Sequence, residues 1–413
     1  MLTLYNRITE QFSLSNMLTP MFDNGRDGDC YEGSIERFIS MKMQGKSLFT
    51  GMTVAMAVLL VIGTLTLFLH FTTASKAQTQ AHSLIPGQTR HFTLYVRSNW
   101  MKMADGQKVF VFGYTDNPNG HAQVPGPTLI VNQGDNVYVT IINDKDPTKT
   151  TYNPTGDGHT IHLHGLDLPS IMDGDPMTAP GGHPVMQGQQ YTYHFIAQYS
   201  GTYYYHCHQS AAEHIQMGMY GALIIRPNGE PNNAYADTPM FDKEYTFVLS
   251  EMDSVSHTVD YGNLYQGGKD VNWTNYHADY FLMNGKSWPD TLNDPNDNIT
   301  ATVGQTVLVR LINTGYQVHS MHSHGFHFLV VGTDGRKLAS PYYKDTIDVS
   351  PGERYDIIFV FNQAGRYMFH DHIEQNMTNN GAYPGGMATM ISVNNRDGSN
   401  PVPMQQIMSS MHS

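Results

Sequence analysis

The amino-acid sequence predicts an all-β protein built from two similar β-sandwich domains. Short runs of alternating apolar and polar residues are separated by Gly, Pro and Asn, as in "VPGPTLIVNQGDNVYVTIIND" (124–144). Runs of this length and spacing are typical of β-sandwiches. Only 14% of the 413 residues are charged, whereas Gly and Tyr are abundant, which favours turn-rich β-structure over helical bundles.

The chain repeats itself, which predicts two domains of about 150 residues each. The segment "QGQQYTYHFIAQYSGTYYYHCH" (187–208) aligns without gaps with "PGERYDIIFVFNQAGRYMFHDH" (351–372), and "HTIHLHG" (159–165) matches "HSMHSHG" (319–325). We therefore expect the first domain at 78–228, a Pro- and Asn-rich linker at 229–243, the second domain at 244–398 and a Met-containing tail at 399–413.

The N-terminal part of the chain has the features of a targeting element. Residues 47–75 carry no charged side chain, and basic residues precede them. A spanning helix needs about 20 residues, so this run is long enough to anchor the chain with its N-terminus inside. Cleavage at "ASKA" (74–77) would instead make it a signal peptide. We expect 1–46 to be cytoplasmic or to precede the true start, and 47–77 to be the anchor or signal peptide. The remainder would then work outside the cytoplasm, membrane-anchored or secreted.

The net charge of -13, with no basic stripe, argues against nucleic acid as a partner. The chain has 21 histidines but only two cysteines, Cys30 and Cys207, which lie on opposite sides of the apolar run. A disulfide between them is therefore not expected, and Cys207 must be explained by packing, reactivity or metal binding.

The residues around Cys207 predict a blue-copper site. Such a site combines two imidazoles, one thiolate and a weak axial thioether, because soft sulfur ligands suit copper that cycles between Cu(I) and Cu(II). The stretch "YYYHCHQSAAEHIQMGMYG" (203–221) supplies the thiolate, an imidazole and two methionines, of which Met219 is preferred over Met217 as the axial ligand. The predicted ligands are His159, Cys207, His214 and Met219.

The remaining histidines occur as four His-x-His pairs: His162/His164, His206/His208, His322/His324 and His370/His372. Alternate residues of a strand face the same side, so each pair presents two imidazoles together, and Cys207 faces away from His206 and His208. Eight imidazoles are too many for one zinc ion, which takes about four ligands. A cluster of copper ions open to oxygen is the economical interpretation.

Together, His-x-x-His-x-His, His-Cys-His and the following His and Met resemble the motifs of two-domain, small-laccase-like multicopper oxidases. The resemblance covers about residues 88–394 and implies two cupredoxin-like Greek-key domains and four copper ions per chain. The family assigns type 1 copper to the blue site above. It implies that His162 and His322 bind type 2 copper and that six histidines bind the type 3 pair: His164, His206, His208, His324, His370 and His372.

The resemblance also implies a function and an assembly. A small reductant (a phenol, a metal ion or a small inorganic compound) would donate electrons one at a time, and Cys207, His206 and His208 would conduct them to the cluster that reduces O2 to water. In two-domain relatives that cluster lies between subunits of a homotrimer. The alternatives are a copper nitrite reductase, which carries Asp in place of His162 and lacks a histidine after the cysteine, and a copper carrier, which would not need the extra histidines.

The sequence departs from the family pattern in two places. The loop from Cys207 to His214 is longer than is usual in laccases by two residues. In the second domain Asp371 stands where the thiolate should be, with Asn376 near a ligand position, so we expect no type 1 copper there and a hydrogen bond from His319 to Asp371. Asp173 and Asp175, in a loop near the copper sites, are expected either to form turns or to attract a cationic substrate.

Overall fold

The structure is a computed structural model that describes residues 85–148, 157–177 and 184–400. All of these residues belong to one compact unit, His82–Ser413. The predicted segments 1–46 and 47–77, and residues 401–413 of the tail, lie outside the described residues. Within the described ranges, every helix is too short or too polar to cross a membrane.

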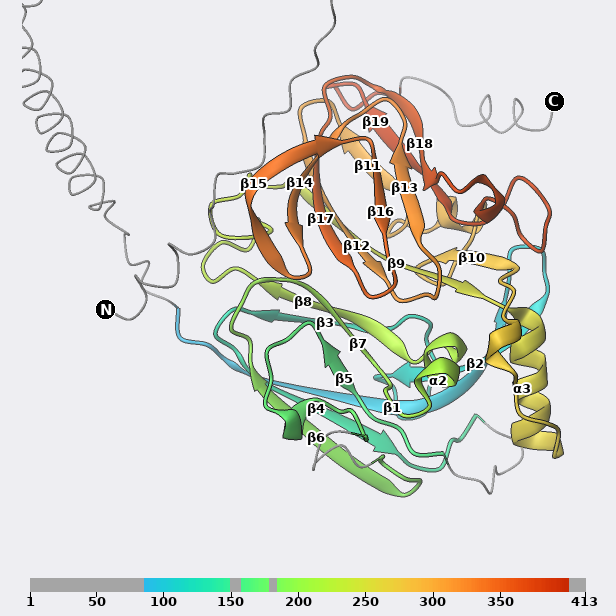
Figure 1. The fold of residues 1–413 in the computed structure, drawn as a ribbon. Coiled ribbons are helices and arrows are strands. Elements are labelled where there is room, and N and C mark those ends of the chain that lie inside the picture. The colour runs from blue at the N-terminus through green and yellow to red at the C-terminus, as the bar shows by residue number, and fades with distance from the viewer. Residues whose placement is uncertain (1–84, 149–156, 178–183, 401–413) are drawn as a thin grey trace, which may run out of the picture. The chain divides into compact units, whose positions relative to one another are not determined.

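The first sandwich consists of two four-stranded sheets, shown at the bottom of Figure 1. Neighbouring strands are often not consecutive in the chain, as Greek-key connections require. One sheet has the order β2(Lys108–Thr115), β1(Thr89–Lys102), β4(Asn136–Asn143) and β6(Gln189–Ile196); the other has β3(Gly126–Asn132), β8(Tyr220–Arg226), β7(Gly201–His206) and β5(His162–His164).

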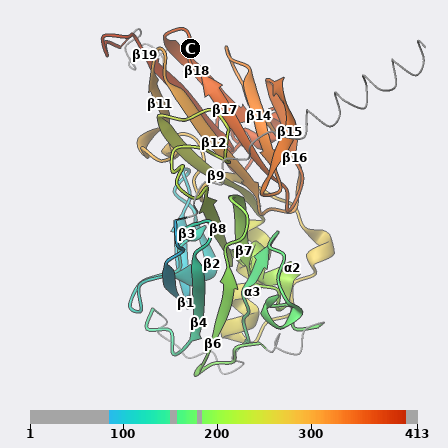
Figure 2. The same ribbon diagram turned by 90° about the vertical axis from the view of Figure 1, so that its left-hand side faces the viewer.

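The second sandwich consists of a six-stranded and a five-stranded sheet, at the top of Figure 1 and seen from another side in Figure 2. The larger sheet has the order β10(Tyr280–Met283), β9(Lys243–Met252), β12(Thr306–Asn313), β17(Arg354–Val360), β14(Phe328–Thr333) and β15(Arg336–Lys344); the smaller has β11(Ile299–Thr302), β19(Ala388–Asn394), β18(Gly365–Asp371), β13(His319–Ser323) and β16(Thr346–Val349).

Each sandwich has its own apolar core, because alternate residues of its strands face the opposing sheet. In β4 the inward residues Val137, Val139 and Ile141 are fully buried, and they share a core with Leu163 and Tyr205 of the facing sheet. A separate core of the second sandwich contains buried residues from both of its sheets. The predicted mostly-β architecture is therefore confirmed.

The two sandwiches repeat the same strand pairings, as the duplicated sequence predicts. In the first, β1 pairs with β4 in parallel and β5 with β7 antiparallel; in the second, β9 pairs with β12 in parallel and β13 with β18 antiparallel. The registers also correspond, since His162 lies opposite His206 and His322 opposite His370. The repeat therefore places equivalent histidines at equivalent points of both sandwiches.

The helices are few and short, and two of them lie beside the candidate site. The helix α2(Ala211–Met217) follows Cys207, and α3(Ser254–Gln266) packs on β2 (Figure 1), where Tyr261 and Tyr265 contact the ring of Phe110. The remaining helical turns are the 3-10 segments η2(Ser170–Met172), η3(Trp273–Asn275), η4(Asp290–Asn293) and η5(Glu374–Asn376).

The helix α3 connects the two predicted domains. It lies between β9 and β10 of the second sandwich in the chain, yet its buried His257 contacts the Phe110 carbonyl oxygen at 2.5 Å from Nδ1. Strand β8 ends at Arg226 and strand β9 begins at Lys243, on either side of the expected linker. The exact domain boundaries stay a prediction.

Candidate metal centres

Cys207 lies at the end of β7, fully buried in the core of the first sandwich. Its Sγ atom is 3.2 Å from Nδ1 of His214, and the Thr160 backbone N–H donates to it at 3.4 Å. Ring nitrogens of His159 and His214 and the Cys207 sulfur all lie within 4.8 Å of one another. The structure therefore brings together three of the four predicted type 1 ligands, all buried and drawn from separate segments.

The loop that carries His214 contains a helix that the sequence patterns did not predict. The helix α2 accommodates the longer spacing between Cys207 and His214. It ends at Gly218, which adopts a φ of 118° that a residue with a side chain rarely adopts. Met219 then returns to the site: its N–H donates to the His214 carbonyl oxygen at 2.9 Å, and its own carbonyl accepts from the Cys207 N–H at 3.0 Å. Met217 and Met219 are both fully buried, so the axial role of Met219 stays a prediction.

The four His-x-His pairs form two groups, which we call the domain-1 and domain-2 histidine clusters. In the domain-1 cluster, ring centroids are 5.0 Å apart for His162 and His206 and 5.3 Å apart for His162 and His208. In the domain-2 cluster, His322 lies 5.1 Å from His324 and 5.2 Å from His372. Among the described residues, no ring contact joins one cluster to the other. The members are His162, His164, His206 and His208 in the domain-1 cluster, and His322, His324, His370 and His372 in the domain-2 cluster.

Backbone carbonyls orient several of these imidazoles. His206 Nδ1 lies 2.9 Å from the Cys207 carbonyl oxygen, and His370 Nδ1 lies 3.0 Å from that of Asp371. A ring nitrogen that contacts a carbonyl carries the proton, so Nε2 of each ring keeps its lone pair for a metal. The same relation in both sandwiches follows from the repeated strand register.

Burial holds three of these imidazoles neutral: His164, His206 and His214. Burial lowers the pKa of His214 to about 3 and that of His164 to about 3, with the Arg354 charge adding to the effect on His164. Burial also lowers the pKa of His206 well below its ordinary value. Neutral imidazoles are the form that binds metal, so these side chains need not lose a proton first.

Asp173 and Asp175 have a role that sequence reasoning missed. The Asp173 carbonyl oxygen lies 2.7 Å from His162 Nδ1, and Asp175 Oδ1 lies 3.4 Å from His208 Nδ1. These residues therefore orient two members of the domain-1 cluster, in the way that second contacts commonly orient metal-binding histidines. Both were expected to form turns or to attract a cation, and their spacing from the His-x-His pairs gave no signal of this contact.

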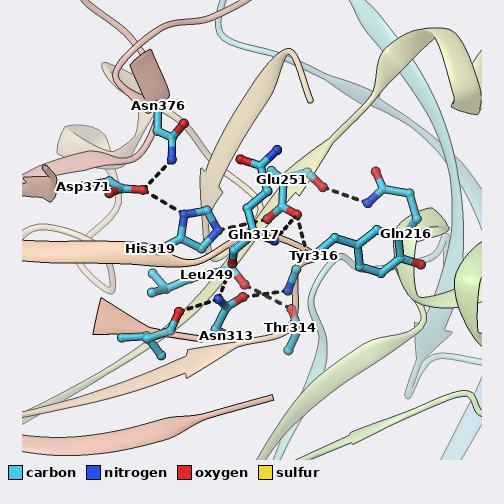
Figure 3. A network of polar contacts seen from close by, with 12 residues as sticks. Gln216, Leu249, Glu251, Asn313, Thr314, Tyr316, Gln317, His319, Asp371 and Asn376 are labelled. Carbon is cyan, nitrogen blue, oxygen red and sulfur yellow. Dashed lines mark hydrogen bonds and ion pairs between the residues drawn. The ribbon is translucent and has the colours of Figure 1, made fainter. Parts of the chain in front are cut away.

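In the second sandwich, the position of the type 1 site holds a network of charged and polar side chains (Figure 3). His319 Nδ1 lies 2.8 Å from Asp371 Oδ2, and His319 Nε2 lies 2.9 Å from Glu251 Oε2. Asn376 donates from Nδ2 to Asp371 Oδ2 at 2.7 Å. All four side chains are buried. Burial lowers the pKa of His319, but the hydrogen bonds that its ring donates to the Asp371 and Glu251 carboxylates raise the pKa to about 9.

Both ring nitrogens of His319 are thus occupied by carboxylates, so this imidazole offers no lone pair to a metal. The expected hydrogen bond between His319 and Asp371 is present. Glu251 was not predicted, because it lies on β9, far from both residues in sequence. The network continues to the first sandwich: Gln216 of α2 donates from Nε2 to the Glu251 carbonyl oxygen at 3.1 Å, and Tyr316 donates to the Ala212 carbonyl oxygen (Figure 3 shows Gln216 and Tyr316).

A group of acidic side chains adjoins the type 1 candidate. Carboxylate oxygens of Asp157 and Glu213 and a ring nitrogen of His214 lie within 4.8 Å of one another. Burial raises the pKa of Glu213, and the carboxylates of Asp260 and Asp157 raise it further. Burial also raises the pKa of Asp260, which comes from α3 and has 1% of its surface exposed. Nothing in the sequence indicated that α3 would bring this carboxylate to α2.

Comparisons with known proteins agree with this arrangement. Two family models described as multicopper oxidase match residues 119–230 and 265–389. Laccase-7 of Oryza sativa subsp. japonica is 33% identical over 257 residues, which cover 59% of this chain and 41% of the rice protein. Laccase-3 of Botryotinia fuckeliana is 30% identical, over 62% of this chain and 52% of the fungal protein. The chain thus spans about half or less of the length of these curated laccases.

Solved structures extend the similarity over most of the described residues. The multicopper oxidase mgLAC is 35% identical with a TM-score of 0.62, and the match covers 76% of this chain and 88% of that one. The blue copper oxidase of Nitrosomonas europaea is 29% identical with a TM-score of 0.61, covering 76% of this chain and 89% of its own. A copper nitrite reductase from the same organism, at 20% identity and a TM-score of 0.56, shares the fold.

Proposed function

Because this chain belongs to the multicopper oxidase family, we propose that it couples one-electron oxidation of a small reductant to the reduction of dioxygen. Four electrons and four protons convert one O2 into two molecules of water, so four reductant molecules are oxidised in each cycle. Phenols, metal ions and small inorganic compounds are the candidate reductants.

The observation that carries the proposal is the position of Cys207 between two different groups of ligands. Its sulfur lies beside His214, 3.2 Å from Nδ1, whereas the neighbouring His206 lies in ring contact with His162 of the domain-1 cluster. Three consecutive residues, 206–208, therefore link a thiolate site to an imidazole site through covalent bonds. A copper carrier would need only the thiolate site.

The donor atoms fit the copper set of the family. A thiolate with two neutral imidazoles suits a type 1 ion, and imidazoles alone suit type 2 and type 3 ions. When bound, copper supplies one-electron redox chemistry and binds oxygen. We assign type 1 to His159, Cys207, His214 and Met219, type 2 to His162 and His322, and type 3 to His164, His206, His208, His324, His370 and His372.

The protein's own part is to hold the imidazole donors in their ligating form. Burial keeps the imidazoles of His164, His206 and His214 neutral. Carbonyl contacts at Nδ1 of His162 and His206 leave the opposite nitrogen of each ring as the one that would bind a metal. Asp175 beside His208 restrains a ring that is 38% exposed. These restraints reduce the rearrangement that the ligands undergo when the metal binds or changes its charge.

The assembly that fits these clusters is a homotrimer. Each histidine cluster supplies half of the expected ligand set, and the two clusters belong to different sandwiches. A domain-1 cluster of one subunit facing a domain-2 cluster of its neighbour would complete the set, as family resemblance suggests. The proposal also places the enzyme outside the cytoplasm, held by residues 47–77 as a membrane anchor or released after their cleavage.

The test uses purified, copper-loaded protein in an oxygen electrode with 2,6-dimethoxyphenol as the reductant. We expect oxygen uptake by the wild type and its loss in His208→Ala, while the blue absorption of the Cys207 site persists. His327→Ala, an exposed histidine outside both clusters, serves as the control. Consumption of nitrite without oxygen, combined with no oxygen uptake, would instead support a nitrite reductase.

A further inference from the structure

The helix that carries His214 is too short to hold its own position. α2 has seven residues, and its N-cap residue Ser210 makes no side-chain hydrogen bond to the first turn. Isolated helices shorter than about 12 residues are marginal in water, so contacts with other elements must fix α2. The position of the His214 ring, whose Nδ1 lies 3.2 Å from the Cys207 sulfur, therefore depends on the elements against which α2 packs.

The buried side chain of Gln216 joins α2 to the second sandwich through both ends of its amide group. Its Nε2 donates to the Glu251 carbonyl oxygen at 3.1 Å, and its Oε1 accepts from the Asp253 backbone N–H at 3.1 Å. Glu251 lies near the end of β9, and Asp253 caps the helix α3. A side-chain amide can donate and accept at once, whereas an apolar side chain of the same size would make neither contact.

Tyr316 makes a second contact between the second sandwich and α2. Its hydroxyl donates to the Ala212 carbonyl oxygen, about one helical turn before Gln216. Tyr316 is itself held by Glu251, whose Oε1 accepts from the Tyr316 backbone N–H, while Oε2 lies 2.9 Å from His319 Nε2 (Figure 3). Glu251 therefore connects the charged network of the second sandwich to both contacts, through its carbonyl group and through its carboxylate.

Gln216 and His214 lie on different sides of α2. Successive residues of a helix are rotated by about 100°, so positions two apart are separated by about 200°. His214 accordingly faces Cys207, and Gln216 faces β9. A shift of α2 would move the His214 ring relative to the sulfur and would also move Met219, which follows the helix. The potential of a type 1 copper is tuned by its axial ligand and by the groups around the thiolate sulfur.

We propose that Gln216 is a positioning residue through which the second sandwich fixes the ligand geometry, and so the redox potential, of the type 1 copper in the first. The network around His319, which offers no metal site of its own, then has a role at the copper site of the other sandwich. This inference rests on the proposed function, because it takes His214 and Met219 as type 1 ligands.

Two substitutions release α2 from the second sandwich. Gln216→Met keeps the length and the helix propensity of the side chain and removes both of its hydrogen bonds. Tyr316→Phe removes the other contact and keeps the ring, so a folding defect in one variant does not decide the outcome. Thr291→Val is the matched control, because it removes a buried hydrogen bond of 2.7 Å from Oγ1 to a backbone carbonyl of β19 in the second sandwich.

The first test measures hydrogen exchange of the metal-free protein. The His214 N–H donates to the Ser210 carbonyl oxygen, and the Met219 N–H donates to that of His214, at 2.9 Å each. Exchange at these groups reports local opening of α2 and of the turn after it. We expect both groups to exchange at least tenfold faster in Gln216→Met and Tyr316→Phe than in Thr291→Val.

The second test measures the midpoint potential and the absorption maximum of the blue copper by redox titration of the copper-loaded protein. We expect both to shift in Gln216→Met and Tyr316→Phe, at the copper content of the wild type, and to stay unchanged in Thr291→Val. Faster exchange with an unchanged potential and spectrum would leave Gln216 a purely structural contact and overturn the proposal, as would exchange equal to that of the control. A wild type that binds copper without blue absorption would reject the type 1 site itself, whereas a blue wild type that both variants match would reject only this inference.

Discussion

His319 and Asp371 in the second sandwich take the places that His159 and Cys207 take in the first, and their side chains contact each other, with 2.8 Å between Nδ1 and Oδ2. A histidine and a thiol in the first sandwich thus correspond to an ion pair in the second. Glu251 completes the arrangement from the other side of the ring, 2.9 Å from Nε2. The two sandwiches therefore have equivalent positions for these side chains, but the second has an ion pair where the first has a candidate metal site.

Removing His319 should destabilise the protein strongly. His319→Phe would leave the buried carboxylates of Asp371 and Glu251 without their shared cation, which typically costs about 3–5 kcal/mol. Urea denaturation monitored by fluorescence measures the change in unfolding free energy. His327→Phe, at a ring that is 68% exposed, should change it by no more than about 0.5 kcal/mol. Equal effects of the two substitutions would show that the ion pair does not stabilise the fold.

The same ion pair predicts a loss of stability at alkaline pH. The pKa of His319 is raised to about 9, above its ordinary value of 6.5. A raised histidine pKa contributes stability that is fully present below the unfolded value and is lost as pH rises through the folded value. The difference in unfolding free energy between wild type and His319→Gln should therefore narrow as the pH rises from about 6.5 to about 9, and become constant above that. A constant difference between those two pH values would contradict a protonated His319.

Asp175 should affect the copper cluster without affecting the blue site. Its Oδ1 lies 3.4 Å from His208 Nδ1, so Asp175→Asn weakens the restraint on that ring. Changes of this kind typically lower metal affinity or activity about 10–100-fold. Copper analysis after dialysis and oxygen uptake measure the effect, while the visible absorption of the Cys207 site should persist. Asp167→Asn, which removes an exposed partner of Arg336, should leave both unchanged.

Gly218 should be essential to the loop that brings Met219 to the site. It has a φ of +118°, and a Cβ atom there would meet Val124 Cγ2 at 2.5 Å. Gly218→Ala therefore combines backbone strain with a clash, which costs about 1–3 kcal/mol beyond the strain. Gly188→Ala isolates the strain, because Gly188 has a φ of +84° with nothing within 4 Å of the added atom. Thermal unfolding measures the loss of stability in both variants, and the blue absorption of Gly218→Ala shows whether the site still forms. An equal loss of stability in the two variants would show that the contact with Val124 adds nothing to the backbone strain.

The sequence was sufficient to predict the repeated β-sandwiches and the grouping of the histidines. Both follow from local rules, since alternation places every second residue of a strand on one face, and the gapless repeat transfers one strand register to the other domain. The structure accordingly groups His162 with His206 and His322 with His370.

The contacts that sequence reasoning missed join segments far apart in the chain. Glu251 reaches His319 from β9, and Asp260 reaches Glu213 from α3, an arrangement that depends on how α3 packs against β2. No periodicity or spacing encodes such a meeting of side chains. The helix α2 was missed for a different reason: "SAAEHIQMG" is too short to show a helical repeat, and its place beside the site depends on tertiary contacts such as that of Gln216 with Glu251.

The central claim is that Cys207 holds a metal ion of its own, separate from the ions held by the two histidine clusters. Copper analysis and visible spectroscopy of copper-loaded wild type and Cys207→Ser test it most directly. We expect about four copper ions per chain in the wild type with intense visible absorption, and loss of one ion and of all that absorption in the variant. Absorption that survives in Cys207→Ser, or a wild type that binds a single copper ion per chain, would contradict the claim.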